Sequence, residues 1–386
     1  MAIYLDHAAS SPLRPEAAEA LAVYACASYA GANPNSLHTP GREAARALEG
    51  ARKEISQLLG GSARPSELIF TSGGTEADNL AVIGLSEAVR MQRGARDAVV
   101  ISAIEHEAVL ACAPELRRRG FEVRIAASSC RGIIEPAALE STLDERCALV
   151  SIMTANNETG MVQPIAELAA AAHAHGALFH TDAVQAFTRI PLSAGPVDAL
   201  SISAHKVGGP VGIGALYLKT GIRLQPLLHG GGQERGLRPG TQNVSGALAF
   251  AAAAQASACA HRVHADALRV RSSMLVEKLV LADLGICPTV DAAYDGGRLP
   301  GTVHIAVSGI EAGAVLLRLD AAGFAISSGS ACSAGSRDSS HVLSAMGVPR
   351  ERSLGALRIS FDERVSDSEL SAFADALIGC VGSLRR

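Results

Sequence analysis

The stretch VDALSISAHKVGGP, residues 197–210, places a lysine directly after an apolar run. The run from Val197 to Ile202 predicts a strand, and the glycines that follow the lysine predict a sharp turn. Lys206 would then stand at a strand end beside His205, where neighbouring groups can orient an amine that forms a Schiff base. The alternative is an ordinary surface lysine at the end of a strand.

Strands and helices alternate on the N-terminal side of this stretch. The hydrophobic pattern predicts strands at 67–70, 98–102, 122–126, 148–153 and 177–180, and helices at 75–90, 108–119 and 165–175. Alternation of this kind indicates βαβ units and a mostly parallel sheet with helices on both faces. From about residue 245 the pattern changes to a long alanine-rich helix, followed by a smaller α+β region with strands at 302–307 and 357–361.

We therefore expect an α/β fold with two domains. The large domain would span residues 15–255, and the small domain would combine residues 1–14 with 256–386. A chain of 386 residues with 48% hydrophobic residues is long enough to bury two cores of this size.

The composition argues against several classes of protein. The formal net charge of −4 gives no reason to expect direct binding of nucleic acid or of an anionic membrane. The longest apolar stretch, residues 247–260, is shorter than the roughly 20 residues of a membrane span, and the N-terminus does not read as a secretory signal. The eight cysteines lack C-x-x-C or metal-ligand spacing, so we expect no metal site, a cytoplasmic location and mostly buried thiols.

The stretch SGGTE, residues 72–76, links a predicted strand to a predicted helix. Its glycines allow close approach, and the helix N-terminus offers N–H groups to an anion such as phosphate. Gly74 and Thr75 are the candidate phosphate ligands. The alternative is that Thr75 and Asp78 form a capping box at the start of the helix.

Other polar residues follow neighbouring strands. Asp182 suits a protonated pyridine nitrogen, Gln185 and Asn157 suit a ring oxygen, and His106 offers a flat ring for stacking. Taken singly, each could be a helix cap, a turn residue or a loop histidine. Together with a lysine amine and a phosphate cradle at the ends of one parallel sheet, they indicate pyridoxal 5'-phosphate.

A second group of candidates lies in the smaller region. The stretch SSGSACSAGS, residues 327–336, has small polar residues typical of a loop, which makes Cys332 a candidate nucleophile rather than a core thiol. Arg358, within a predicted strand, could bind a substrate carboxylate through two hydrogen bonds. The alternatives are an incidental loop cysteine and a partly exposed strand arginine.

These motifs resemble those of the cysteine desulfurases, in the NifS/IscS-like branch of the class V aminotransferase family. The resemblance covers nearly the whole chain and implies the PLP-dependent transferase fold type I, with the nucleophile loop at 327–341. The matching motifs are FTSGGTEADN (70–79), EH (105–106), NNETG (156–160), HTDAVQ (180–185), SAHKVGGPVGIGALY (203–217), HGGGQERGLRPGTQNV (229–244) and SSGSACSAGS (327–336).

The resemblance also implies a role for each candidate residue. Catalysis would fall to Lys206, which binds the cofactor covalently, to Cys332, which takes the sulfur, and to His106, which stacks on the ring and moves protons. Other residues would bind the cofactor, the partner subunit's cofactor phosphate or the substrate carboxylate. These are Asp182 at the ring nitrogen; Gln185 and Asn157 at the ring hydroxyl; Gly74, Thr75, Ser203 and His205 at the phosphate; Thr241 at the partner's phosphate, which implies a homodimer; and Asn33 and Arg358 at the substrate carboxylate.

The implied activity is that of a sulfurtransferase that removes sulfur from L-cysteine, leaving L-alanine and a persulfide on Cys332. The sulfur would pass to an acceptor protein, either an iron–sulfur scaffold or a thiolation protein, and Cys332 is also a candidate transient iron–sulfur ligand. Two alternatives remain: another pyridoxal-phosphate lyase or aminotransferase of this fold, and a mainly non-catalytic platform for sulfur transfer. The chain departs from the usual family sequence at Ala32, Pro239 and Asp362.

Overall fold

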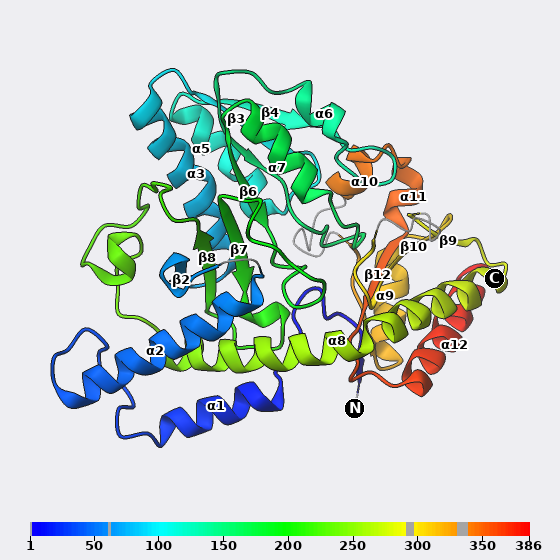
Figure 1. Cartoon of the computed structure of the whole chain (residues 1–386). Coiled ribbons are helices and arrows are strands. Elements are labelled where there is room, and N and C mark those ends of the chain that lie inside the picture. Colours follow the sequence, from blue (N-terminus) through cyan, green and yellow to red (C-terminus); the bar gives the residue numbers. More distant parts are fainter. Residues whose placement is uncertain (1, 61–62, 291–296, 330–338) are drawn as a thin grey trace.

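A seven-stranded sheet forms the centre of the larger region (Figure 1). The computed structural model describes residues 2–60, 63–290, 297–329 and 339–386, so Cys332 lies outside the described residues. The strand order is β2-β8-β7-β6-β5-β3-β4; β8 runs antiparallel to both neighbours, and the pairs from β7 to β4 are parallel. The strands are β2 (Leu68–Thr71), β3 (Ala98–Ser102), β4 (Glu122–Ala126), β5 (Cys147–Ser151), β6 (Leu178–Asp182), β7 (Ala199–Ser203) and β8 (Gly214–Leu218).

Helices cover the sheet, which explains why five of its strands are buried along their whole length, namely β2, β3, β5, β7 and β8. The prediction of a mostly parallel mixed sheet flanked by helices is confirmed. The covering elements are α3 (Gly74–Arg93), α4 (Glu107–Leu110), α5 (Cys112–Arg118), α6 (Pro136–Glu140) and α7 (Ile165–Ala174), with short 3-10 turns η1 (Pro65–Glu67), η2 (Ala204–Lys206) and η3 (Gln233–Gly236).

The single helix predicted over residues 108–119 is wrong, because the chain forms α4 and α5 instead. Pro114 lacks the backbone N–H that would bond to the carbonyl of Leu110 in a continuous helix, so the two helices separate at Ala111.

Helix α8 (Val244–Leu281) is 38 residues long and runs through both regions of the molecule (Figure 1). Its alanine-rich first half packs against α1 (Pro15–Ala25) and α2 (Thr39–Leu58), since small side chains let helices approach closely. Its second half places Leu268 and Leu275 in the core of the smaller region. The predicted domain boundary at residue 255 lies inside this continuous helix, and the division of the chain stays a prediction.

The smaller region is built on an antiparallel sheet of order β12-β10-β9, beside a parallel pair, β1 and β11. Strand β1 comes from the N-terminus, so the first residues pack with the C-terminal part of the chain. The elements are β1 (Ile3–Tyr4), β9 (Ile286–Pro288), β10 (Thr302–Val307), β11 (Phe324–Ala325) and β12 (Ala356–Ser360), with α9 (Ala312–Ala321), α10 (His341–Ala345), α11 (Arg350–Leu354) and α12 (Asp367–Leu384).

The prediction that most cysteines are buried is wrong. Of the seven cysteines that the structure describes, only Cys112 and Cys147 are buried, and Cys26, Cys130 and Cys259 are exposed. Burial raises the pKa of Cys112 to about 12, so this thiol is not reactive. Within the described ranges, no helix is both long and apolar enough to cross a membrane.

A buried ion pair fixes the segment that precedes α8. Arg52 of α2 and Glu234 of η3 approach to 2.7 Å, and the same carboxylate accepts a hydrogen bond from the backbone N–H of Phe70 at 2.9 Å. Glu234 has a φ of 45°, a left-handed conformation that is costly for a residue with a side chain. The ion pair therefore holds a strained turn against α2 and β2.

We predict that Glu234→Gln lowers the free energy of unfolding by about 3–5 kcal/mol, because it leaves the buried guanidinium of Arg52 without its counterion. The matched control is Glu49→Gln, which removes a second carboxylate from Arg52 whose side chain is 61% exposed. That control should cost less than about 1 kcal/mol. Urea unfolding measures both, and equal losses for the two variants would contradict this account.

Candidate functional site

The carboxyl ends of four neighbouring parallel strands carry the candidate residues. His106 follows β3, Asn157 follows β5, Asp182 ends β6 and Lys206 follows β7. Parallel strands present their carboxyl ends at the same edge of a sheet, where α/β proteins bind ligands. The charges of His106 and Lys206 both act on Asp182, which shows that these groups share one site.

Lys206 reaches back to the N-terminal segment of the chain. Its Nζ donates hydrogen bonds to the carbonyl oxygens of Ala8 at 2.6 Å and Ala9 at 2.9 Å. A surface lysine at a strand end would not be held in this way. Burial, followed by the charges of Lys206 and His106, lowers the pKa of His205 to about 4, so His205 is neutral at pH 7.

Asp182 is a buried carboxylate at the centre of the site. Burial raises its pKa, while His106, a hydrogen bond from the backbone N–H of Val184 and Lys206 lower it. The bond to Val184 is a local turn contact and not a helix cap, because the described residues between β6 and β7 form no helix. A cation placed against this carboxylate would restore its charge, which is what a protonated pyridine nitrogen requires.

A polar layer lies under Asp182 and joins three strands. His180 of β6 bonds through its two ring nitrogens to Ser151 of β5 and Ser201 of β7, each at 2.9 Å. Burial lowers the pKa of His180 to about 3, which keeps the ring neutral. Asp78 of α3 lies 3.8 Å from His180 Nε2. Burial, together with the charge of Asp182, raises the pKa of Asp78 well above its usual value. Negative charge is therefore favoured on Asp182 rather than on Asp78.

His106 begins α4, and its Nδ1 accepts a hydrogen bond from the backbone N–H of Ala108 at 3.1 Å. In the neutral ring the proton must then sit on Nε2. The neighbouring Glu105 is fully buried and accepts hydrogen bonds from the Ser102 hydroxyl and the Met153 N–H. Glu105 therefore links the ends of β3 and β5 through these hydrogen bonds. Because burial raises the pKa of Glu105 to about 8, this carboxyl does not carry a full negative charge at neutral pH.

The start of α3 offers an anion cradle. The helix begins at Gly74, and a Cβ at this position would lie 2.8 Å from the Val184 side chain, so only glycine fits. Ser203, at the end of β7, has a buried hydroxyl oxygen that bonds to no other group in the described part of the chain. The capping-box alternative for Thr75 is wrong, because the N-cap is Gly73 and no side chain caps the helix. These features fit a phosphate group.

Among the described residues, the buried side-chain oxygen of Asn157 has no hydrogen-bond partner, as expected for a group that meets a ligand hydroxyl. The Nε2 of Gln185 donates to the Ala8 carbonyl at 2.9 Å, and its role at the ring hydroxyl stays a prediction. Asn156, which the sequence did not single out, builds the turn. It donates to the Ile104 carbonyl and accepts from the Thr159 N–H.

Arg358 of β12 is 2% exposed, so the alternative of a partly exposed strand arginine is wrong. Its guanidinium donates to the Asn157 carbonyl and pairs with Asp6, both at 2.8 Å, and its Nε has no hydrogen-bond partner among the residues that the structure describes. A substrate carboxylate could satisfy that nitrogen. Asp6 was not predicted, because nothing in the sequence connects it with a residue 352 positions away.

The described ends of the segment that carries Cys332 lie at this site. On one side, the backbone of Ser327 pairs with that of Arg358. On the other, the Ser340 hydroxyl donates to the buried carboxylate of Glu158 at 2.6 Å. A Cβ at Gly329 would lie 2.7 Å from the same carboxylate, so glycine is needed there.

Asn33 and Thr241 lie outside this arrangement. Both are exposed, and the side-chain oxygen of Asn33 accepts hydrogen bonds from Asn35. Asn35 in turn contacts Gln242, beside Thr241. In the part of the chain that the structure describes, no hydrogen bond or ion pair joins Asn33 to Arg358, and the joint role of these two residues at a substrate carboxylate stays a prediction.

Among the described residues, no group of three or more histidine, cysteine or acidic side chains is arranged to hold a metal ion.

Comparison with known proteins agrees with this geometry. The family model for aminotransferase class-V matches residues 3–373. The chain is 41% identical to a cysteine desulfurase of Gluconacetobacter diazotrophicus over 100% of this chain and 94% of the relative. It is also 41% identical to the IscS-like cysteine desulfurase of Mycobacterium tuberculosis, over 99% of this chain and 97% of that protein.

A solved structure described as a NifS-like protein superposes on this chain with a TM-score of 0.90 and 33% sequence identity. The match covers 99% of this chain and 100% of the other. This likeness confirms the prediction of the PLP-dependent transferase fold type I. The chain belongs to the class V aminotransferase family, within the branch of the NifS- and IscS-like cysteine desulfurases.

Proposed function

We propose that this chain is a pyridoxal-phosphate-dependent cysteine desulfurase that converts L-cysteine to L-alanine and keeps the sulfur as a persulfide on Cys332. The observation that carries the proposal is one shared site. It combines Lys206, the buried carboxylate of Asp182 and the buried guanidinium of Arg358 with the described ends of the segment around Cys332.

The orphaned polar atoms of the site support the cofactor. Ser203, with the N-terminus of α3, would hold the phosphate, Asn157 would bond to the ring hydroxyl and Asp182 would bind the ring nitrogen. The remaining proposed phosphate ligands are Gly74, Thr75 and His205. When bound, pyridoxal phosphate supplies an electron sink for the bond-breaking at the substrate's Cα.

The residues of the chain would then divide the work. The Nε of Arg358 takes the substrate carboxylate, and the amine of Lys206 accepts the Cα proton. The Cys332 thiolate attacks the substrate sulfur, so that an S–S bond forms while the C–S bond breaks and its electron pair stays with carbon. Return of the proton from Lys206 to Cα, and delivery of a proton to Cβ, for which we propose His106 Nε2, would complete alanine.

The two alternatives are less well supported. A lyase or aminotransferase would not need a cysteine in a segment whose ends lie beside the substrate arginine. A non-catalytic platform would not need the buried Asp182 together with Lys206 and Cys332. We further propose a homodimer, a sulfur-acceptor protein as partner and the cytoplasm as the location, with the acceptor either an iron–sulfur scaffold or a thiolation protein.

We predict that Cys332→Ser retains the cofactor and still binds L-cysteine, because Lys206, Asp182 and Arg358 are unchanged. It should form no protein persulfide, as measured by mass spectrometry of the intact protein. The control, Lys206→Ala, should instead lose the visible absorbance of the bound cofactor. If Cys332→Ser releases sulfide as fast as the parent, the sulfur leaves by another route and the proposed function fails.

We predict that Thr241→Val lowers cofactor affinity by about tenfold to a hundredfold, since one hydrogen bond to a charged group contributes roughly 1.5–3 kcal/mol. The second measurement uses hybrid dimers of one Thr241→Val subunit and one Lys206→Ala subunit. If Thr241 serves the partner's site, one site of the hybrid is intact and the other carries both defects. Cofactor titration of such hybrids should therefore recover half of the tight sites. If no tight site returns, Thr241 acts within its own chain.

A further inference from the structure

Residues 5–14, which we call the N-terminal strap, connect β1 to α1 and touch the proposed active site at three places. Asp6 pairs with Arg358 at 2.8 Å. The carbonyl oxygens of Ala8 and Ala9 accept the two hydrogen bonds from Lys206 Nζ. The Ser11 N–H donates to the His205 carbonyl at 2.9 Å. The position of the strap therefore determines where the amine of Lys206 lies.

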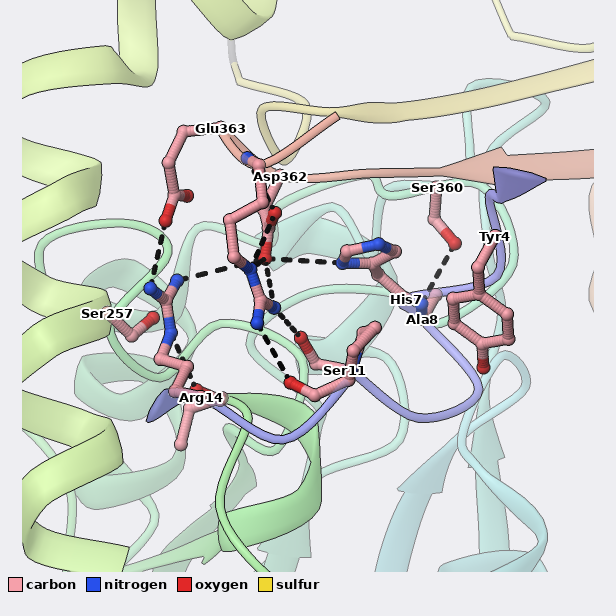
Figure 2. A network of polar contacts seen from close by, with 12 residues as sticks. Tyr4, His7, Ala8, Ser11, Arg14, Ser257, Ser360, Asp362 and Glu363 are labelled. Carbon is pink, nitrogen blue, oxygen red and sulfur yellow. Dashed lines mark hydrogen bonds and ion pairs between the residues drawn. The ribbon is translucent and has the colours of Figure 1, made fainter. Parts of the chain in front are cut away.

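The end of β12 holds the first part of the strap. The Ser360 N–H donates to the Leu5 carbonyl at 2.8 Å, and the His7 N–H donates to the Ser360 carbonyl at 3.2 Å. The Ser360 hydroxyl accepts from the Ala8 N–H at 2.8 Å (Figure 2). The contacts with Leu5 and Ser360 therefore hold the strap from Leu5 to Ala8.

The strap is also held by Asp362, which lies two residues after β12 (Figure 2). Its Oδ2 lies 3.2 Å from His7 Nδ1, 3.7 Å from an Arg14 nitrogen and 2.6 Å from an Arg364 nitrogen. The carboxylate is mostly buried. Burial alone would raise its pKa, but the close contacts with His7 and Arg364 outweigh burial and hold the pKa well below its ordinary value.

The two residues that follow bind the rest of the strap. Glu363 pairs with Arg14 at 2.9 Å. Arg364 donates to the Pro12 carbonyl at 3.0 Å and to the Ser11 hydroxyl at 2.9 Å. The contacts of residues 362–364 thus bracket Ala8 and Ala9, the two positions that contact Lys206.

Arg14 carries the connection onward to the lysine segment. Its Nε donates to the Val207 carbonyl at 3.2 Å, and its backbone N–H donates to the Gly208 carbonyl at 2.8 Å. Gly208 has a φ of 82°, and a Cβ there would lie 2.6 Å from the Arg14 side chain. The turn after Lys206 is therefore shaped around Arg14, which Asp362 and Glu363 hold.

We propose that Asp362 is a positioning residue for Lys206, because it fixes through His7 and Arg14 the strap whose Ala8 and Ala9 carbonyls hold the lysine amine. Removing its charge leaves Arg14, Arg364 and His7 facing one another without a central anion, and the strap is expected to shift. Lys206 then loses two acceptors that favour its protonated form. The catalytic consequence rests on the proposed role of Lys206 as the amine that accepts the Cα proton.

The test compares Asp362→Asn with the matched control Asp198→Asn. Asp198 is also a buried carboxylate held by a histidine, with His173 Nε2 at 2.7 Å and the Phe179 N–H at 2.8 Å, but it lies at the opposite end of β7 from Lys206. We expect kcat for L-cysteine to fall about tenfold to a hundredfold in Asp362→Asn, the cost of a misplaced catalytic group. KM should change less, because Arg358 keeps its bond to the Asn157 carbonyl. The control should show neither effect.

Two further measurements do not depend on desulfurase activity. Amide hydrogen exchange of residues 5–14 in the cofactor-free protein should accelerate in Asp362→Asn and not in Asp198→Asn. The pH midpoint of the bound cofactor's visible absorbance should shift in the same variant only. If Asp362→Asn does not fold, His7→Gln, which removes a single contact of the carboxylate, should give a smaller shift of both kinds.

Unchanged exchange of the strap, or an unchanged absorbance midpoint, would overturn the positioning role even if activity falls. If the parent protein proves inactive toward L-cysteine while both measurements shift as described, the proposed function fails and the positioning role stands.

Discussion

The site depends on the parallel alignment of β3, β5, β6 and β7, which brings residues from distant parts of the sequence to one edge of the sheet. The alignment is reinforced beneath the site. His180 links three strands through two serine hydroxyls, and Glu105 links the ends of β3 and β5. Burial lowers the pKa of His180 to about 3 and raises the pKa of Glu105 to about 8, so both groups favour their neutral forms.

The smaller region completes the site from the other side. Strand β12 supplies Arg358 and pairs with Ser327 at the start of the cysteine-bearing segment, while Glu158 of the larger region holds Ser340 at its far end. The N-terminal strap lies between the two regions and bonds to both, through Lys206 on one side and the residues after β12 on the other. Arg358 and the amine of Lys206 are therefore positioned by one connected set of contacts.

The sequence predicted the strand ends well, because Asp182, His106 and Lys206 each follow an apolar run that reads clearly as a strand. It could not predict the strap, since Ala8 and Ala9 contact Lys206 through backbone oxygens that leave no side-chain signature. The contact of the Gln185 amide with the Ala8 carbonyl could not be predicted for the same reason. Pro114, which divides one predicted helix into two, was visible in the sequence and was overlooked.

The central claim is that sulfur passes from L-cysteine to the protein while the amino group stays on the three-carbon skeleton. Product analysis tests this claim most directly. The cofactor-loaded protein is mixed with L-cysteine without a reductant, and alanine, pyruvate, ammonia and protein-bound sulfur are measured in the first turnover. The account predicts alanine and protein-bound sulfur in equal amounts, with neither pyruvate nor ammonia. Pyruvate and ammonia formed together with sulfide would contradict it and identify a lyase.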